Sequence, residues 1–76
     1  MIREHDLIVL ASDLPEFGLK EGDLGTVIDV HGNEGFEVEF ITVSGETVAV
    51  VTLERKQVRA VGPGEMHHAR PMERNA

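Results

Sequence analysis

Apolar residues recur along the chain with a period near two, in short runs that are rich in Val and Ile. This alternation is typical of β-strands, because successive side chains of a strand point to opposite faces of its sheet. Gly, Asn, Asp and Ser separate the runs and favour turns. The pattern predicts five strands, over residues His5–Ala11, Leu24–His31, Phe36–Val43, Glu46–Leu53 and Val58–Val61.

Mostly short connections join these predicted strands. The tetrad Gly32–Gly35 tolerates positive φ and predicts a tight turn, and Ser44-Gly45 predicts a second one. A longer loop, Ser12–Glu21, precedes the second strand, and one helical turn is expected at Glu54–Gln57. Five short strands with such connections predict an all-β fold, a small barrel that leaves few free edges.

The chain is long enough for one domain. A chain of 76 residues buries roughly 60% of its unfolded surface, which does not support two separate cores. The Gly62–Gly64 segment breaks any strand, and the residues after it show no periodicity. We therefore expect a barrel domain over residues 1–61 and a flexible, disordered tail over residues 62–76.

The sequence predicts a cytoplasmic protein without a membrane partner. Cysteine is absent, so apolar packing and sheet hydrogen bonds must stabilise the core, which suits a reducing compartment. The first six residues carry charges of both signs and no apolar stretch, unlike a signal peptide. No later run reaches the length of a membrane span.

Negative charge is concentrated in the predicted domain. Residues 1–61 hold twelve Asp and Glu against five Lys and Arg, whereas residues 62–76 hold two of each sign. A phosphate backbone attracts clustered Lys and Arg and is repelled by an acidic surface, so we expect no direct binding of nucleic acid. A basic protein is the better electrostatic complement.

The order of these segments resembles an SH3-like barrel. Leu19–Asp23 resembles the diverging turn of that fold, and Thr52–Gln57 resembles the helical turn before its last strand. The chain also resembles a family of short bacterial proteins, domain of unknown function 4926, in the runs Asp13–Val27, Phe36–Phe40 and Val51–Leu53. That resemblance implies small stand-alone proteins, some of which are regarded as antitoxins or immunity proteins because they are encoded beside toxin-like genes.

Signalling SH3 domains bind polyproline segments in a groove of stacked aromatic rings. This chain has no Trp or Tyr, and its three aromatic residues are Phe17, Phe36 and Phe40. The alternation places Phe36 and Phe40 with Val38 on one face of a strand, which we predict to point inward. A polyproline groove is therefore not expected.

The candidates for catalysis and metal binding have ordinary explanations. Two serines lie in predicted turns, where a hydroxyl usually bonds to nearby backbone. An Asp and a His two positions apart on one strand are normal surface neighbours, and two adjacent His in the tail fall short of the four ligands of a structural metal site. We therefore expect no enzyme, cofactor or metal site from these residues: Ser12, Ser44, Asp29, His31, His67 and His68.

An acidic patch is predicted on the outer surface of the barrel. Glu37 and Glu39 point away from the inward face of their strand, and Asp29 and Glu46 lie on neighbouring strands. Such a patch is either a solvated barrel exterior, which is usual for strands, or an electrostatic mimic of nucleic acid that meets a basic partner.

Two predicted strands are apolar on both faces. A small barrel has a single interior, so one set of side chains on each strand must be covered from outside, unless bulges intervene. The covering is either the loop residues Leu14, Phe17 and Leu19 or a partner, which a contiguous exposed apolar patch would mark. The predicted partner-binding residues are Ile8, Asp29, Glu37, Glu39, Val48 and Val50.

These observations favour a non-catalytic protein-binding module of the antitoxin or immunity type, with a neighbouring basic protein as its partner. The alternative is a homodimeric small barrel that aids assembly of an enzyme complex, and an enzyme built on Asp29 and His31 is a distant third hypothesis.

Overall fold

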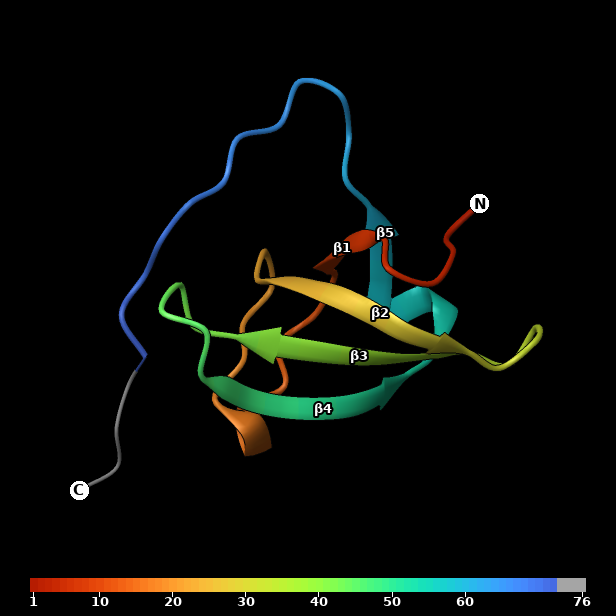
Figure 1. Ribbon diagram of the computed structural model, residues 1–76, viewed down its shortest axis with the longest axis horizontal. Helices are drawn as coiled ribbons and strands as arrows, with labels where there is room; N and C mark the ends of the chain where they lie inside the picture. Colours follow the sequence, from red (N-terminus) through yellow and green to blue (C-terminus); the bar gives the residue numbers. More distant parts are fainter. Residues whose placement is uncertain (73–76) are drawn as a thin grey trace.

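The computed structural model describes residues 1–72, and these form five antiparallel strands in one sheet, in the order β4-β3-β2-β1-β5 (Figure 1). Two single turns of 3-10 helix lie in the connections, η1 (Pro15–Phe17) and η2 (Arg55–Gln57). The prediction of an all-β, five-stranded fold is confirmed, and so is the helical turn before the last strand. The strands are β1 (Leu7–Leu10), β2 (Leu24–Val30), β3 (Phe36–Ile41), β4 (Thr47–Leu53) and β5 (Val58–Ala60).

The topology is that of a small SH3-like barrel which stays open on one side. β1 pairs with both β2 and β5, so the first and last strands are neighbours. β2, β3 and β4 follow one another as an antiparallel meander. β4 and β5 therefore form the two edges of the sheet.

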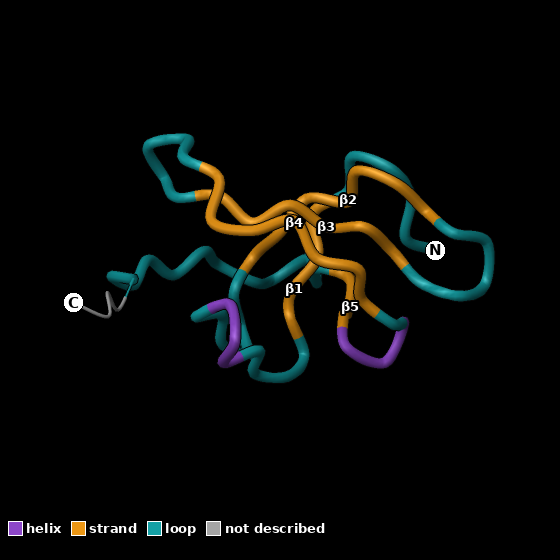
Figure 2. Tube along the Cα trace, turned by 90° about the horizontal axis from the view of Figure 1, so that it is seen from below, coloured by secondary structure: helices purple, strands orange, loops and turns teal. Residues whose placement is uncertain are grey.

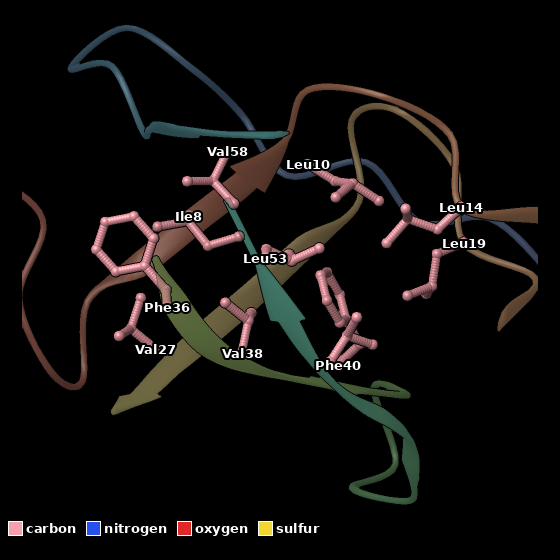
Figure 3. Close-up of a cluster of buried hydrophobic side chains, with 11 residues drawn as sticks. Ile8, Leu10, Leu14, Leu19, Val27, Phe36, Val38, Phe40, Leu53 and Val58 are labelled. Carbon is pink, nitrogen blue, oxygen red and sulfur yellow. The ribbon is translucent and has the colours of Figure 1, made fainter. Parts of the chain in front are cut away.

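The core lies on the concave side of this sheet, as the alternation in β3 predicts. Phe36 and Val38 are completely buried, and Phe40 is 2% exposed. Leu14 and Leu19 of the β1–β2 loop join the same cluster beside Leu10 and Phe40 (Figure 3). Full burial of each such side chain contributes about 1.5–3 kcal/mol. The cluster comprises Ile8, Leu10, Leu14, Leu19, Val27, Phe36, Val38, Phe40, Val51, Leu53 and Val58.

Residues 62–72 form no helix or strand. They arch away from β5 and then run down one side of the domain (Figure 1), ending between the β3–β4 hairpin and the loop that carries η1 (Figure 2). The flexibility predicted for residues 62–76 stays a prediction, and its last four residues lie outside the described part of the chain. Within the described residues, no helix has the length and apolar character needed to cross a membrane.

Candidate functional site: the outer face of the sheet

The outer face of the sheet is the convex side of β1 to β4, opposite the core. The pairing register sets Leu7 against Thr26, Thr26 against Glu39 and Glu39 against Val50, so these four side chains form one row across four strands. Leu7 is 46% exposed and Val50 is 47% exposed. A row of two half-exposed apolar side chains around a carboxylate is suited to contact with another macromolecule.

The next row, toward the β3–β4 hairpin, is more apolar. Val9 pairs with Leu24, and Ile41, which is 52% exposed, comes one position after the inward-facing Phe40. Val43, in the hairpin itself, is 97% exposed. Apolar exposure is therefore greatest at this end of the outer face.

The opposite end of the outer face is acidic. Asp29 and Glu37 are paired across β2 and β3, and His31 Nε2 lies 3.4 Å from Glu37 Oε2. One donor atom from each of these three residues lies within 4.8 Å of the other two. Asp29 Oδ1 already accepts the backbone N–H of Val30 at 2.9 Å. Two carboxylates and an imidazole could bind a cation or a basic side chain, but three partly exposed donors fall short of the usual four-ligand structural metal site.

β-Bulges explain why strands that looked apolar on both faces do not leave two equivalent apolar surfaces. The register shifts between Val27 and Asp29 in β2, and the pairing with β4 shifts between Phe40 and Ile41. The second shift places one extra residue, Val48, between the partners of those two residues, Ala49 and Thr47. A bulge changes the local alternation of side chains, so Val48 is half-buried and packs against the core.

Of the six predicted partner-binding residues, one is buried in the core, and the other five differ in how far they are exposed. Ile8 is 0% exposed in the core, so its prediction as a surface residue is wrong. Register with β2 and β5 turns Ile8 inward, and its neighbour Leu7 takes the outward position. Asp29, Glu37, Glu39 and Val50 lie on the outer face as predicted, and their role in binding stays a prediction. Val48 is half-buried and packs against the core.

The chain's own C-terminal segment passes beside the outward-facing side of β1. Val9 is 5% exposed yet does not belong to the core cluster. Instead it borders a cavity of about 80 Å³ together with Leu24, Met66 and His67. We call residues 65–72 the strap, because they cross this end of the outer face. The loop residues Leu14 and Leu19, by contrast, fill the core, and Phe17 is 41% exposed.

A groove of about 350 Å³ lies between the strap and the β3–β4 hairpin. Its barrel side is mainly apolar and its strap side carries the two adjacent histidines. The residues that border it include Leu7, Leu24, Ile41, Val43, His67, His68 and Met72.

The strap is attached to the domain by two arginine–carboxylate pairs that the sequence did not predict. Arg59 of β5 binds Glu65 through two contacts of 2.8 and 2.7 Å. Arg70 binds Asp23 through Nε–Oδ1 at 2.8 Å and Nη2–Oδ2 at 2.6 Å. Nothing periodic marks a contact between residues 47 positions apart. The signal that the sequence offered was one of charge: Arg70 follows a domain with an excess of carboxylates and could be expected to pair with one of them.

Electrostatics at the strap follow from these pairs. Burial raises the pKa of Asp23, but the hydrogen bonds from Arg70 and from the Lys20 N–H outweigh it, so the pKa of Asp23 lies below its usual value. The Arg59 hydrogen bonds, with the Gly62 N–H, lower the pKa of Glu65 to about 2. Both carboxylates are therefore ionised at neutral pH.

Comparison with known proteins gives one match. The model of the family described as Domain of unknown function (DUF4926) matches residues 4–60, from the segment before β1 to the end of β5. No curated protein and no solved structure gave a significant match. The outer face and Asp23 lie inside the matched region, whereas the strap lies outside it.

Proposed function

The chain belongs to the DUF4926 family, and we propose that it is a non-catalytic protein-binding module whose outer face docks a basic protein. The observation that carries this proposal is the row across the outer face that holds the half-exposed Leu7 and Val50. Leu7 and Val50 are each nearly half exposed on a sheet face that no other strand or helix of residues 1–72 covers.

Charge complementarity selects the class of partner. The chain carries a formal charge of −7, and Asp29, Glu37 and Glu39 lie on or beside the apolar row. Acidic groups at the edge of an apolar patch repel acidic surfaces and attract basic ones, which raises the rate of productive encounter. We therefore expect a partner that presents Lys or Arg around an apolar contact.

The narrower form of the proposal is an antitoxin or immunity role in the cytoplasm. It rests on the resemblance that the sequence carries and on the absence of cysteine. In this form the partner is a toxin-like protein encoded nearby, and the acidic end of the outer face occupies its basic substrate-binding surface.

A homodimeric accessory barrel is the second candidate, and the open sheet edge favours it. β4 is an edge strand and carries the exposed Val50, so two copies could pair edge to edge. The like charge of −7 on each copy opposes that association. Native mass spectrometry at micromolar concentration distinguishes the two candidates, because a dimer that buries Val50 leaves less apolar surface for a foreign protein.

The direct test compares two single substitutions with matched exposure. Val50→Lys places a charge on the outer face, whereas Phe17→Lys places one on η1, and the wild-type side chains are 47% and 41% exposed. A basic protein co-purified from the native host is expressed, purified and titrated against each variant. We expect Val50→Lys to weaken binding by about 2 kcal/mol, or roughly thirtyfold, as for a central interface residue, and Phe17→Lys to leave the affinity unchanged. Equal affinity for both variants would remove the outer face as the docking surface.

A further inference from the structure

Arg70 and Asp23 form the most buried ion pair among the described residues. The Arg70 side chain is 23% exposed and the Asp23 side chain 18%. The guanidinium is held in a two-pronged contact by the carboxylate, and Arg70 Nη2 also donates to the Gly18 carbonyl at 3.0 Å. Two parallel charge-assisted hydrogen bonds with a third acceptor form a geometry that fits guanidinium and not ammonium.

The acceptor side of this contact is built by the barrel without the strap. Asp23 Oδ2 accepts the Lys20 N–H at 2.8 Å, and the Asp23 N–H donates to the Lys20 carbonyl at 3.0 Å. The turn is joined to β1 by reciprocal bonds, from the Gly22 N–H to the Leu10 carbonyl and from the Leu10 N–H to the Asp23 carbonyl, both 2.8 Å. The carboxylate is therefore fixed in place before any guanidinium arrives, as in a preorganised binding site.

The strap, in contrast, is held by side chains. Over residues 63–72, the backbone hydrogen bond recorded within the described chain is the local one from the Glu65 N–H to the Gly62 carbonyl, at 3.2 Å. No strand ladder joins the strap to the sheet in that part of the chain. A segment attached through a few side-chain contacts opens at a lower free energy than the strands beneath it.

We propose that Asp23 and the groove beside it are a receptor for an arginine-bearing segment of the partner, and that Arg70 of the strap occupies Asp23 in cis until the partner replaces it. Arg70, Pro71 and Met72 then define the occupant: a guanidinium on Asp23 and Gly18, followed by an apolar side chain. Met72 shows the second element, because its Cε lies within contact distance of the position that a Cβ on residue 18 would take. This inference rests on the proposed function and names the site and its regulation.

The groove is open while the strap is in place, because the strap forms one of its walls. Its volume of about 350 Å³ extends from Asp23 to Ile41 and Val43 on the hairpin. Ile41 and Val43 remain 52% and 97% exposed with the strap in place. A partner segment with apolar side chains on both sides of its arginine would cover these residues as well, and this additional burial is what favours exchange over the strap.

The test uses the full chain and two synthetic peptides. The first peptide has the sequence of residues 64–72, and the second carries citrulline, which is uncharged and similar in shape, in place of its arginine. Each is titrated by NMR into ¹⁵N-labelled wild type and into Arg70→Ala, which removes the guanidinium of the strap from Asp23. We expect the arginine peptide to shift the amide signals of Gly18, Asp23 and Leu24 in Arg70→Ala. Its apparent affinity there should exceed that for wild type by about tenfold or more, since the strap reduces the competent fraction.

Controls make the outcome decisive. Adding Asp23→Asn to Arg70→Ala should reduce the affinity to that of the citrulline peptide, whereas adding Glu34→Gln, which removes the same charge from the exposed β2–β3 turn, should not. Unchanged β3 amide signals verify that each variant is folded. Equal affinities for wild type and Arg70→Ala, equal affinities for the two peptides, or no binding at millimolar concentration would each overturn the inference.

The two proposals can fail separately. The peptide titration requires no natural partner, so its failure leaves the Val50→Lys comparison intact. Conversely, a partner affinity that is unchanged by Val50→Lys and raised by Arg70→Ala would place the docking surface at the receptor groove and not at the row that contains Leu7 and Val50.

Discussion

Which side chains of β1 face the core is a question that one pair of substitutions can answer. Ile8 and Leu7 are adjacent, similar in size and opposite in exposure, at 0% and 46%. Ile8→Ala removes a fully buried side chain and leaves a cavity, which costs about 2–5 kcal/mol. Leu7→Ala removes a half-exposed side chain, and we expect it to cost less than about 1 kcal/mol.

These magnitudes are large on the scale of the whole domain. A chain of 76 residues is expected to be stable by about 4–11 kcal/mol, so Ile8→Ala removes a substantial share of the total. With a urea dependence near 1 kcal/mol per molar for a small domain, the unfolding midpoint should move down by about 2 M or more. Leu7→Ala should move it by less than about 1 M.

Unfolding is best followed by far-UV circular dichroism, because the chain has no Trp or Tyr to report by fluorescence. Ile8→Val, expected to cost about 0.5–1.5 kcal/mol, keeps the comparison informative if Ile8→Ala does not fold. Equal midpoints for the alanine variants of Ile8 and Leu7 would mean that the two faces of β1 are not distinguished as described. The assignment of Leu7 to the row on the outer face would then be wrong.

Two further predictions concern the packing of β2 and the attachment of the strap. Gly25→Ala should destabilise the domain by about 1–3 kcal/mol, because a Cβ at residue 25 would lie 2.5 Å from Val38 Cγ1. The shift of the urea unfolding midpoint measures this cost. Gly64→Ala is the matched control and should be nearly neutral, because the space around Gly64 is open. The pKa of Asp23 is lower in the folded state than its ordinary value of 3.8, so ionised Asp23 stabilises the fold. This contribution is complete at a pH above 3.8 and is lost as the pH falls through the pKa of the folded state. The Arg70 Nε–H signal should therefore hold its position from pH 7 to about 4 and move only below that, and a change near pH 6 would contradict the described pair.

The sequence predicts most of the fold because strand alternation and turn chemistry agree. In β3 the pattern Phe36, Val38, Phe40 against Glu37 and Glu39 leaves one choice of inward face, and the structure has that face buried. In β1 the sequence does not show which side chains face inward, since every residue from Leu7 to Leu10 is apolar. Only the register with β2 and β5, which is a long-range property, selects Ile8 and Leu10 for the core.

The candidate site was less predictable for two physical reasons. A bulge adds one residue to a strand without a distinctive sequence signal, and here the added residue is Val48, which packs against the core while Val50 stays outside. The Arg70–Asp23 pair depends on the path of an irregular segment, which has no period to read. Interpretation of residues 62–76 as a flexible tail followed from that absence of pattern.

The strap changes what the excess of apolar residues implies. Val9 is outward-facing and 5% exposed, and it borders a small cavity whose other side is formed by Met66 and the two histidines of the strap. Removal of the strap would open the cavity at Val9 and Leu24 and the groove beside it, next to the row that already includes Leu7. A partner that competes for Asp23 would thus gain an apolar surface as well as a carboxylate. Exchange of a few side-chain contacts for this larger surface gives the partner an advantage in affinity that the strap, with its short sequence, does not have.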